Sequence, residues 1–136
     1  MTTVTNEIQQ RTRVGWPRIA GTAAAAAVTA TVVWLLWTAV GGVDLEVKSG
    51  GAGAQQIGIG SVVISSLLIA LAGGALLRWW QGRSERGTRR WTILAVGIAV
   101  LSLITPTSAL TVAAGLGLVS LHVVVAVVVI AGLRRR

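Results

Sequence analysis

The stretch IAGTAAAAAVTATVVWLLWTAV, residues 19–40, contains no charged side chain. A helix of about 20 residues, rising about 1.5 Å per residue, crosses a hydrocarbon core of about 30 Å. The length of this run therefore predicts a membrane-spanning helix. A secretory signal peptide is the alternative, because Arg18 precedes the run and Ala39-Val40-Gly41 resembles a small-residue cleavage site. A signal core usually has about 7–15 residues, so we favour the spanning helix.

Three more apolar runs follow the first and lead to a prediction for the whole chain. Together the four runs predict an all-α membrane protein, an up-down-up-down bundle of four transmembrane helices. A polar cytoplasmic tail is expected to precede one transmembrane domain. The expected parts are the tail at 1–15, the domain at 16–136, helices at about 18–40, 57–78, 91–105 and 108–133, an outer loop at 41–56 and a basic inner loop at 79–90.

Pro106 separates the last two expected helices. The residue before a proline is pushed out of helical geometry, so the third helix should end near Ile104 or Thr105. Thr107 or Ser108 is then available to cap the fourth helix. A single kinked helix over 91–133 would be about 60 Å long, far more than one bilayer. The proline therefore predicts a tight helical hairpin.

The outer loop contains a short alternating segment, in which Val43, Leu45 and Val47 alternate with polar residues. This period of two is typical of a strand. Six residues alone do not make a stable sheet. We therefore favour an extended loop over a strand for residues 43–48.

The composition excludes several classes of protein. Only 12% of the residues are charged, against about 25% in soluble domains. The net charge of +8 is divided between the ends of apolar runs, so no continuous basic face for nucleic acid is expected. There is no cysteine, which excludes disulfides and thiolate metal sites. With one histidine and no Asp or Glu in the apolar runs, we expect no metal site and no cofactor.

The basic residues predict the orientation. Lys48 is the only one of the 12 Lys and Arg residues that falls outside three groups: before the first run, at 78–90 and at 134–136. With four spans, these three groups share one side of the membrane. Because Lys and Arg accumulate on the cytoplasmic side, we expect a multi-pass plasma-membrane protein with both termini in the cytoplasm. The tryptophans support this, because such residues mark the interfaces. Trp16, Trp79, Trp80 and Trp91 would mark the inner interface, and Trp34 and Trp37 the outer one.

The inner loop is a candidate site for anionic lipid, because clustered arginines near a span attract acidic headgroups. The candidate contacts are Arg83, Arg86, Arg89 and Arg90. The alternative, which we favour at this point, is that these arginines only determine topology.

His122 is the only ionisable residue inside an expected span. Counting back from Arg134 places it about 18 Å from the inner boundary, near the centre of the bilayer. Small hydroxyl residues occur at a similar depth in the other helices. The candidate midplane polar layer comprises His122, Ser102, Ser65, Ser66 and Thr29. An ionisable group in the membrane suggests function. We favour the alternative, a structural His122 that faces the bundle and bonds a hydroxyl.

Small residues recur at four-residue spacing in three runs. Such rows allow close approach of helix backbones in lipid. The rows are Gly21, Ala25 and Thr29; Ala70 and Gly74; and Ala113 and Gly117. We expect them to pack helices within one chain, with homodimerisation as the alternative.

Several short motifs carry a resemblance to a known family. They are Asp44-Leu45-Glu46-Val47, Ile59-Gly60-Ser61-Val62, Leu101-Ser102-Leu103 with Pro106, and Leu121-His122 before the arginine end. Over residues 16–136 the chain resembles a family of small actinobacterial four-helix membrane proteins with a domain of unknown function. The resemblance implies the fold and no activity, and it assigns no functional residues.

These observations favour a non-enzymatic structural or accessory membrane component, which packs against lipid, a second copy or a larger membrane partner. The alternative is a small-solute or proton transporter that uses the polar layer around His122. A Ser–His–Asp catalytic set is poorly supported, because Asp44 belongs to the outer loop while His122 is expected at mid-membrane.

Overall fold

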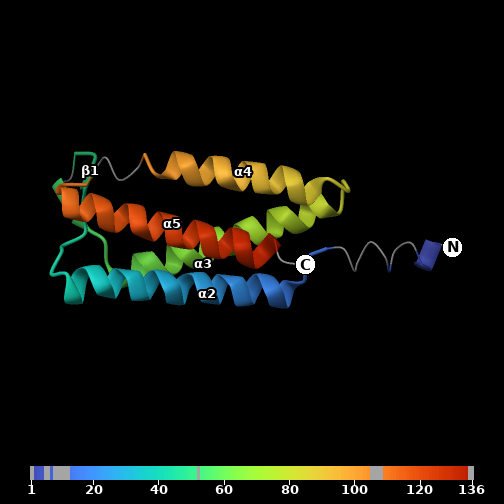
Figure 1. Ribbon diagram of the computed structural model, residues 1–136, viewed down its shortest axis with the longest axis horizontal. Coiled ribbons are helices and arrows are strands. Elements are labelled where there is room, and N and C mark those ends of the chain that lie inside the picture. Colours follow the sequence, from blue (N-terminus) through green and yellow to red (C-terminus); the bar gives the residue numbers. More distant parts are fainter. Residues whose placement is uncertain (1, 5–6, 8–12, 52, 105–108, 135–136) are drawn as a thin grey trace.

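A computed structural model describes residues 2–4, 7, 13–51, 53–104 and 109–134. Its helices are α2 (Trp16–Leu35), α3 (Ile59–Gln81), α4 (Gly87–Ser102) and α5 (Val112–Arg134). They run side by side in alternating directions, and α4 lies at the edge of the bundle (Figure 1). The helix α2 continues into a π-helical turn, η1 (Leu36–Val40), and its first turn contains Pro17, whose missing N–H costs nothing there. The fold is thus an all-α bundle with three long apolar helices and one shorter helix.

Three helices are long and apolar enough to cross a membrane. These segments are Trp16–Val40, Ile59–Gln81 and Val112–Arg134. The helix α4 has 16 residues, which is below the usual length of a span. Its first turn is polar, so only part of this length is apolar. Of the four expected spans, three are therefore supported by length and composition. The fourth, α4, is a helix that packs beside them, and its length does not confirm it as a span.

The basic inner loop is shorter than the expected 79–90. The helix α3 continues through Trp79 and Trp80 to Gln81, and α4 already begins at Gly87. A Cβ on Gly87 would lie 2.6 Å from the carbonyl oxygen of Trp80, so the two helices approach more closely than a side chain permits. The Gln81 amide donates to the Thr88 hydroxyl at 3.0 Å across the turn. Both helices extend past the apolar runs because polar residues also form helical hydrogen bonds, which makes the connection tight.

The connection between α4 and α5 is only partly described. Residues 105–108 lie outside the described residues, and with them Pro106 and the expected caps Thr107 and Ser108. Where the chain is described again, α5 begins one residue after Thr111. The Thr111 hydroxyl accepts a hydrogen bond from the Ala114 amide at 3.0 Å, which is the geometry of a helix N-cap.

The outer loop forms a β-hairpin, so the expected extended loop was wrong. Strand β1 (Glu46–Ser49) pairs antiparallel with β2 (Gly53–Gln56). Val47 also forms a bridge with Ala109, just before α5. The alternating segment thus has partners on both sides. Neither partner was evident from the sequence. Strand β2 contains no alternation of apolar residues, and the contact on the other side involves only Ala109 and Leu110.

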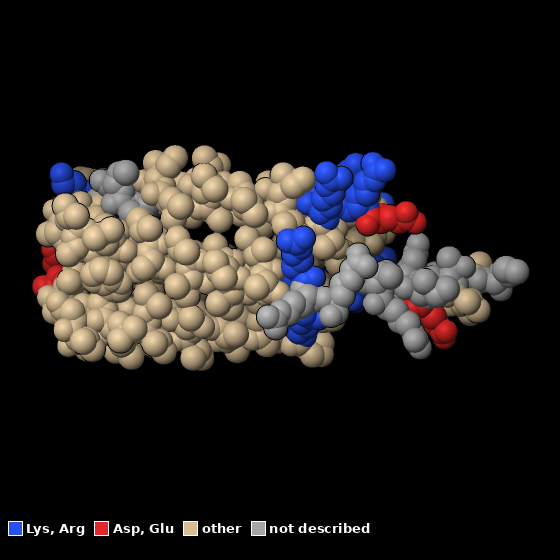
Figure 2. All heavy atoms as spheres, in the orientation of Figure 1, with Lys and Arg blue, Asp and Glu red and all other residues tan. Residues whose placement is uncertain are grey.

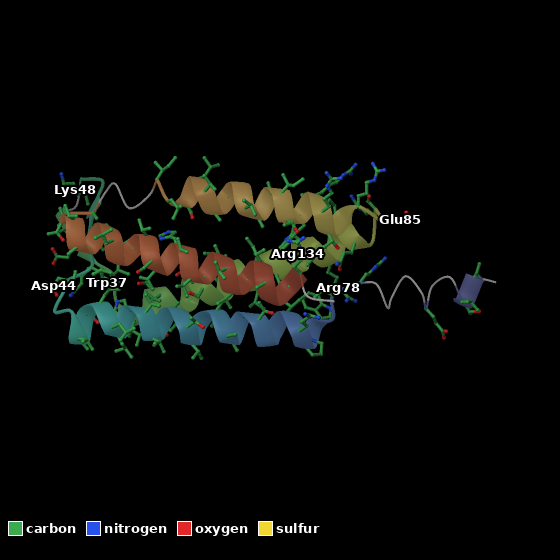
Figure 3. The ribbon with its side chains drawn as sticks, in the orientation of Figure 1. Trp37, Asp44, Lys48, Arg78, Glu85 and Arg134 are labelled. Carbon is green, nitrogen blue, oxygen red and sulfur yellow. The ribbon has the colours of Figure 1, made fainter. Side chains whose placement is uncertain are left out.

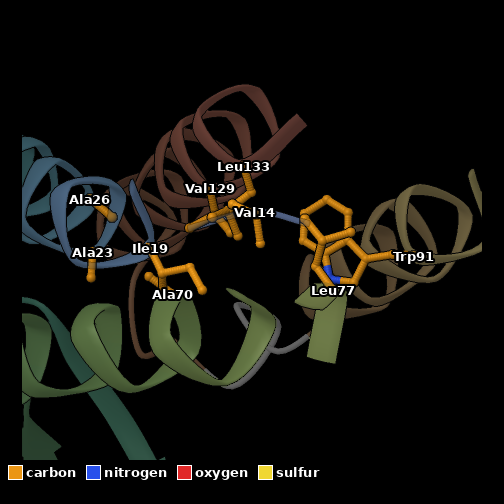
Figure 4. Close-up of a cluster of buried hydrophobic side chains, with 9 residues drawn as sticks. All are labelled: Val14, Ile19, Ala23, Ala26, Ala70, Leu77, Trp91, Val129 and Leu133. Carbon is orange, nitrogen blue, oxygen red and sulfur yellow. The ribbon is translucent and has the colours of Figure 1, made fainter. Parts of the chain in front are cut away.

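Two clusters of buried side chains form the core. The first lies where α2 and α4 begin and where α3 and α5 end (Figure 4). It comprises Val14, Ile19, Ala23, Ala26, Ala70, Leu77, Trp91, Val129 and Leu133. The second lies towards the hairpin and comprises Ala30, Leu45, Val62, Ala114, Leu118 and Leu121. Trp91 is 2% exposed and donates to the carbonyl of Gly73 at 2.9 Å, so it belongs to the core and not to a lipid-facing interface.

Small residues allow these close helix contacts. A Cβ on Gly74 would lie 2.5 Å from the Cγ2 atom of Ile19, and one on Gly117 would lie 2.6 Å from the Cδ2 atom of Leu45. The rows containing Ala70–Gly74 and Gly117 therefore pack within the chain, as expected. Gly21 is different, since it is exposed and a Cβ there would meet no atom within 4 Å.

Candidate functional site

Charged side chains gather at the two ends of the bundle. Arg78, Glu85 and Arg134 lie at one end, while Asp44 and Lys48 lie at the other (Figure 3). The face in Figure 2 shows no charged side chain between the ends. We name the end that contains Arg78, Glu85 and Arg134 the basic end. Its described arginines are Arg13, Arg18, Arg78, Arg83, Arg86, Arg89, Arg90 and Arg134.

The five residues of the expected midplane layer each bond a carbonyl of their own helix. These contacts are Thr29 to Ala25 at 2.7 Å, Ser65 to Ser61 at 2.6 Å, Ser66 to Val62 at 2.7 Å, Ser102 to Ala99 at 2.7 Å and His122 to Leu118 at 2.7 Å. Within the described part of the chain, no hydrogen bond joins two members of the set. Because a carbonyl only accepts, Nδ1 of His122 is the donor in this contact. The structure thus satisfies these polar groups locally.

Two polar contacts between elements lie at the hairpin end of the bundle. The Trp37 indole donates to the Ser120 hydroxyl at 2.9 Å, which joins η1 to α5. The Trp34 indole donates to the carbonyl of Ile57 at 2.9 Å, which joins α2 to the segment before α3. These two tryptophans thus fasten the hairpin end of the bundle through their indole N–H groups.

At the basic end, hydrogen bonds hold the segment before α2 against other helices. The amide of Val14 donates to the Gln81 side chain at 2.7 Å, and its carbonyl accepts from Arg78 Nη1 at 2.8 Å. Arg18 Nε donates to the carbonyl of Gly132 in α5 at 2.8 Å. The two contacts of Val14 fix the N-terminal segment against α3, and the Arg18 contact joins the first turn of α2 to α5.

This arrangement creates an open groove, here called the Arg–Trp groove. It has a volume of about 460 Å³ and is lined by Arg13, Trp16, Ala75, Arg78, Trp79, Gly82 and Arg83. Ala75, Arg78 and Trp79 share one face of α3, and Gly82 continues this spacing of three and four residues at the C-cap of the helix. The fold brings Arg13 and Trp16 to that face. The groove thus combines three guanidinium groups with two indole rings.

Two of these arginines lie over indole rings. The guanidinium carbon of Arg83 is 4.0 Å from the ring centroid of Trp79, and that of Arg78 is 5.6 Å from the ring centroid of Trp16. Such distances are within the range of cation–π attraction. The guanidinium group of Arg13 packs beside Gly82. Its Nε atom is buried and has no hydrogen-bond partner.

The candidate lipid contacts expected from the sequence only partly coincide with this groove. Arg83 lines it, while Arg86, Arg89 and Arg90 are exposed and are not among its lining residues. Sequence reasoning missed Arg13 and Arg78. The helical spacing of Ala75, Arg78, Trp79 and Gly82 was a usable signal for α3, but no local pattern indicated Arg13.

The fold and the segregation of charge define a multi-pass helical membrane protein with three long apolar helices. Residues 10–136 match the Family of unknown function (DUF6069), so the chain belongs to this family. This match confirms one part of the resemblance described above, namely that the chain belongs to a family of unknown function whose model covers most of its length. Comparisons with curated proteins and with solved structures found no match.

Proposed function

We propose that the protein is a four-span component of the plasma membrane, with both termini in the cytoplasm and a non-enzymatic, accessory role. The observation that carries this proposal is the surface between the two charged ends, which is uncharged on the face that Figure 2 shows and is rich in exposed large apolar side chains. An apolar surface of this extent is unfavourable in water and matches the hydrocarbon core of a bilayer. The positive-inside rule then assigns the basic end to the cytoplasm.

The exposure of α4 supports its assignment as the fourth span. Only Gly87 and Trp91 of this helix are buried. Its exposed large apolar residues are Ile93, Leu94, Val96, Ile98, Val100 and Leu101, followed by Leu103 and Ile104. From Trp91 to Ile104 the apolar part of the chain covers about 21 Å at a helical rise. This is shorter than a hydrocarbon core of about 30 Å, and a bilayer accommodates such a mismatch by thinning locally at modest cost. The basic residues at the start of α4 lie at the headgroup level in this arrangement.

The packing of the helices supports an accessory role. Backbone carbonyls accept the hydrogen bonds of the midplane polar groups, and Ala and Gly fill the contacts between α2, α3 and α5. His122 contributes no bond between helices within the described residues. This arrangement is suited to a compact bundle that presents its outer surface to lipid and to other membrane proteins.

The role of His122 is tested by His122→Leu. Interhelical hydrogen bonds in membranes contribute about 0.6 kcal/mol on average, and His122 makes only a local one. We therefore expect the free energy of unfolding in SDS–detergent micelles to change by less than about 1 kcal/mol. Proteoliposomes with an imposed pH gradient should show the proton leak of empty liposomes with either variant. A flux that requires His122 would overturn the accessory role in favour of the transporter.

A further inference from the structure

We propose that the Arg–Trp groove binds the phosphate group of an anionic phospholipid from the leaflet at the basic end. This proposal rests on membrane insertion alone. It does not depend on the number of spans or on which side of the membrane is the cytoplasm.

The guanidinium groups in the groove leave donors free for an anion. The described Asp and Glu residues form no ion pair with Arg13, Arg78 or Arg83. Arg78 uses Nη1 for the carbonyl of Val14, and each guanidinium has five N–H donors. The buried Nε of Arg13 has no acceptor, and a buried donor without a partner is unfavourable. An anion in the groove would accept hydrogen bonds from the unused guanidinium N–H groups and would relieve the repulsion between three like charges.

A phosphate suits these donors better than a carboxylate does. Guanidinium groups bind phosphate oxygens through paired, charge-assisted hydrogen bonds. The three arginines come from three elements, which are the segment before α2, the last turns of α3 and the turn before α4. Such an arrangement can surround a tetrahedral group with several oxygens. Its volume of about 460 Å³ is within the usual range for a small-molecule site.

The surroundings of the groove favour a lipid as the source of this phosphate. Trp16 and Trp79 are 56% and 49% exposed, and exposed indoles favour the level of the lipid headgroups. From Arg78 the groove continues to Ala75, on the apolar part of α3. The lining thus changes from cationic to apolar along one helix, which matches a headgroup joined to acyl chains. A free phosphate would use only the cationic part.

The chain offers a matched pair of double variants. Arg13→Gln with Arg83→Gln removes two guanidinium groups from the groove and keeps the Arg78–Val14 hydrogen bond. Arg86→Gln with Arg89→Gln makes the same change in net charge on exposed residues outside the groove. Gly82→Ala is a third variant that leaves the charge unchanged. Its Cβ would lie 2.8 Å from the Arg13 guanidinium and would displace it from its observed position.

The test is a titration of the full chain, purified in neutral detergent, with phosphatidylglycerol and phosphatidylcholine, followed by native mass spectrometry. We expect phosphatidylglycerol to bind at least ten-fold more tightly than phosphatidylcholine. The groove double variant should weaken phosphatidylglycerol binding about 25-fold, at roughly five-fold for each arginine. The outer double variant should weaken it less than three-fold, and Gly82→Ala should weaken it several-fold.

Each other outcome contradicts the proposal. Equal losses in the two double variants would show diffuse attraction to basic charge without a site. Equal binding of the two lipids would exclude recognition of the anion. Inorganic phosphate that displaces phosphatidylglycerol at equal concentration would assign the groove to free phosphate and exclude the lipid. None of these results would change the proposed arrangement of spans.

Discussion

Gly74→Val should lower the free energy of unfolding by about 3 kcal/mol, the upper part of the range for overpacked cores. The first added carbon alone would lie 2.5 Å from Cγ2 and 2.9 Å from Cγ1 of Ile19. Ile19 is fully buried and cannot turn away from the contact. The substitution must therefore separate α2 from α3. Packing is the main source of stability between helices in lipid, so this separation is costly.

Gly97→Val is the matched control for this prediction. Gly97 also lies within a helix, but a Cβ there would meet no atom within 4 Å. Its effect should stay within about 0.5 kcal/mol, as for other surface substitutions. Both variants can be measured by equilibrium unfolding in SDS–detergent micelles. Equal stabilities for the two variants would show that α2 and α3 do not approach each other as described.

Leu45→Ala should destabilise the hairpin by about 3 kcal/mol, within the range for buried leucines. Leu45 is 1% exposed, and its side chain reaches the backbone of Gly117 in α5. Its carbonyl also accepts a hydrogen bond from the Ile57 amide at 2.8 Å. Truncation leaves a cavity beneath β1 and β2. When the hairpin opens, the side chain of residue 45 is exposed to water. The variant therefore loses the transfer free energy of the removed carbon atoms, and the cost of the cavity in the closed state adds to this loss.

Hydrogen exchange of the Ile57 amide measures this effect directly. We expect it to exchange more than about 100-fold faster in Leu45→Ala than in the unchanged chain, which corresponds to about 3 kcal/mol. Val40→Ala is the control, since Val40 lies at the same end and is 80% exposed. It should leave the exchange rate nearly unchanged. If Leu45→Ala also leaves it unchanged, the leucine does not hold the hairpin to the bundle.

The three long helices were predictable because lipid restricts which residues a membrane-spanning segment contains. A span needs a long apolar run, and the runs at 19–40, 57–77 and 108–133 each correspond to a long helix. The shortness of the third expected helix also followed from Pro106. The helix ends were less predictable. Residues 79–81 and 87–90 are polar or interfacial and yet helical, since hydrogen bonding along the backbone continues beyond the apolar run.

The hairpin and the groove depend on contacts that no local pattern encodes. Glycine dominates the turn of the hairpin, where Gly51 and Gly53 have φ of 83° and 84°, and the second strand is wholly exposed. Arg13 lies far from Arg78 in the sequence, and it lines the same groove because its neighbour Val14 bonds both Gln81 and Arg78. Depth counting predicted that His122 and four hydroxyl residues share one level of the bundle. It carried no information about partners, and each proved to bond its own helix.

Cysteine labelling tests the four-span arrangement most directly, because the chain has no cysteine of its own. Single cysteines at Gly50, Glu85 and Leu110 place one thiol in each described connection between helices. A thiol reagent that cannot cross membranes is applied to intact cells, with permeabilised cells as the control. We predict labelling at residues 50 and 110 and protection at residue 85. Protection at both 85 and 110, with labelling at 50, would mean that α4 does not cross the bilayer and would contradict the account.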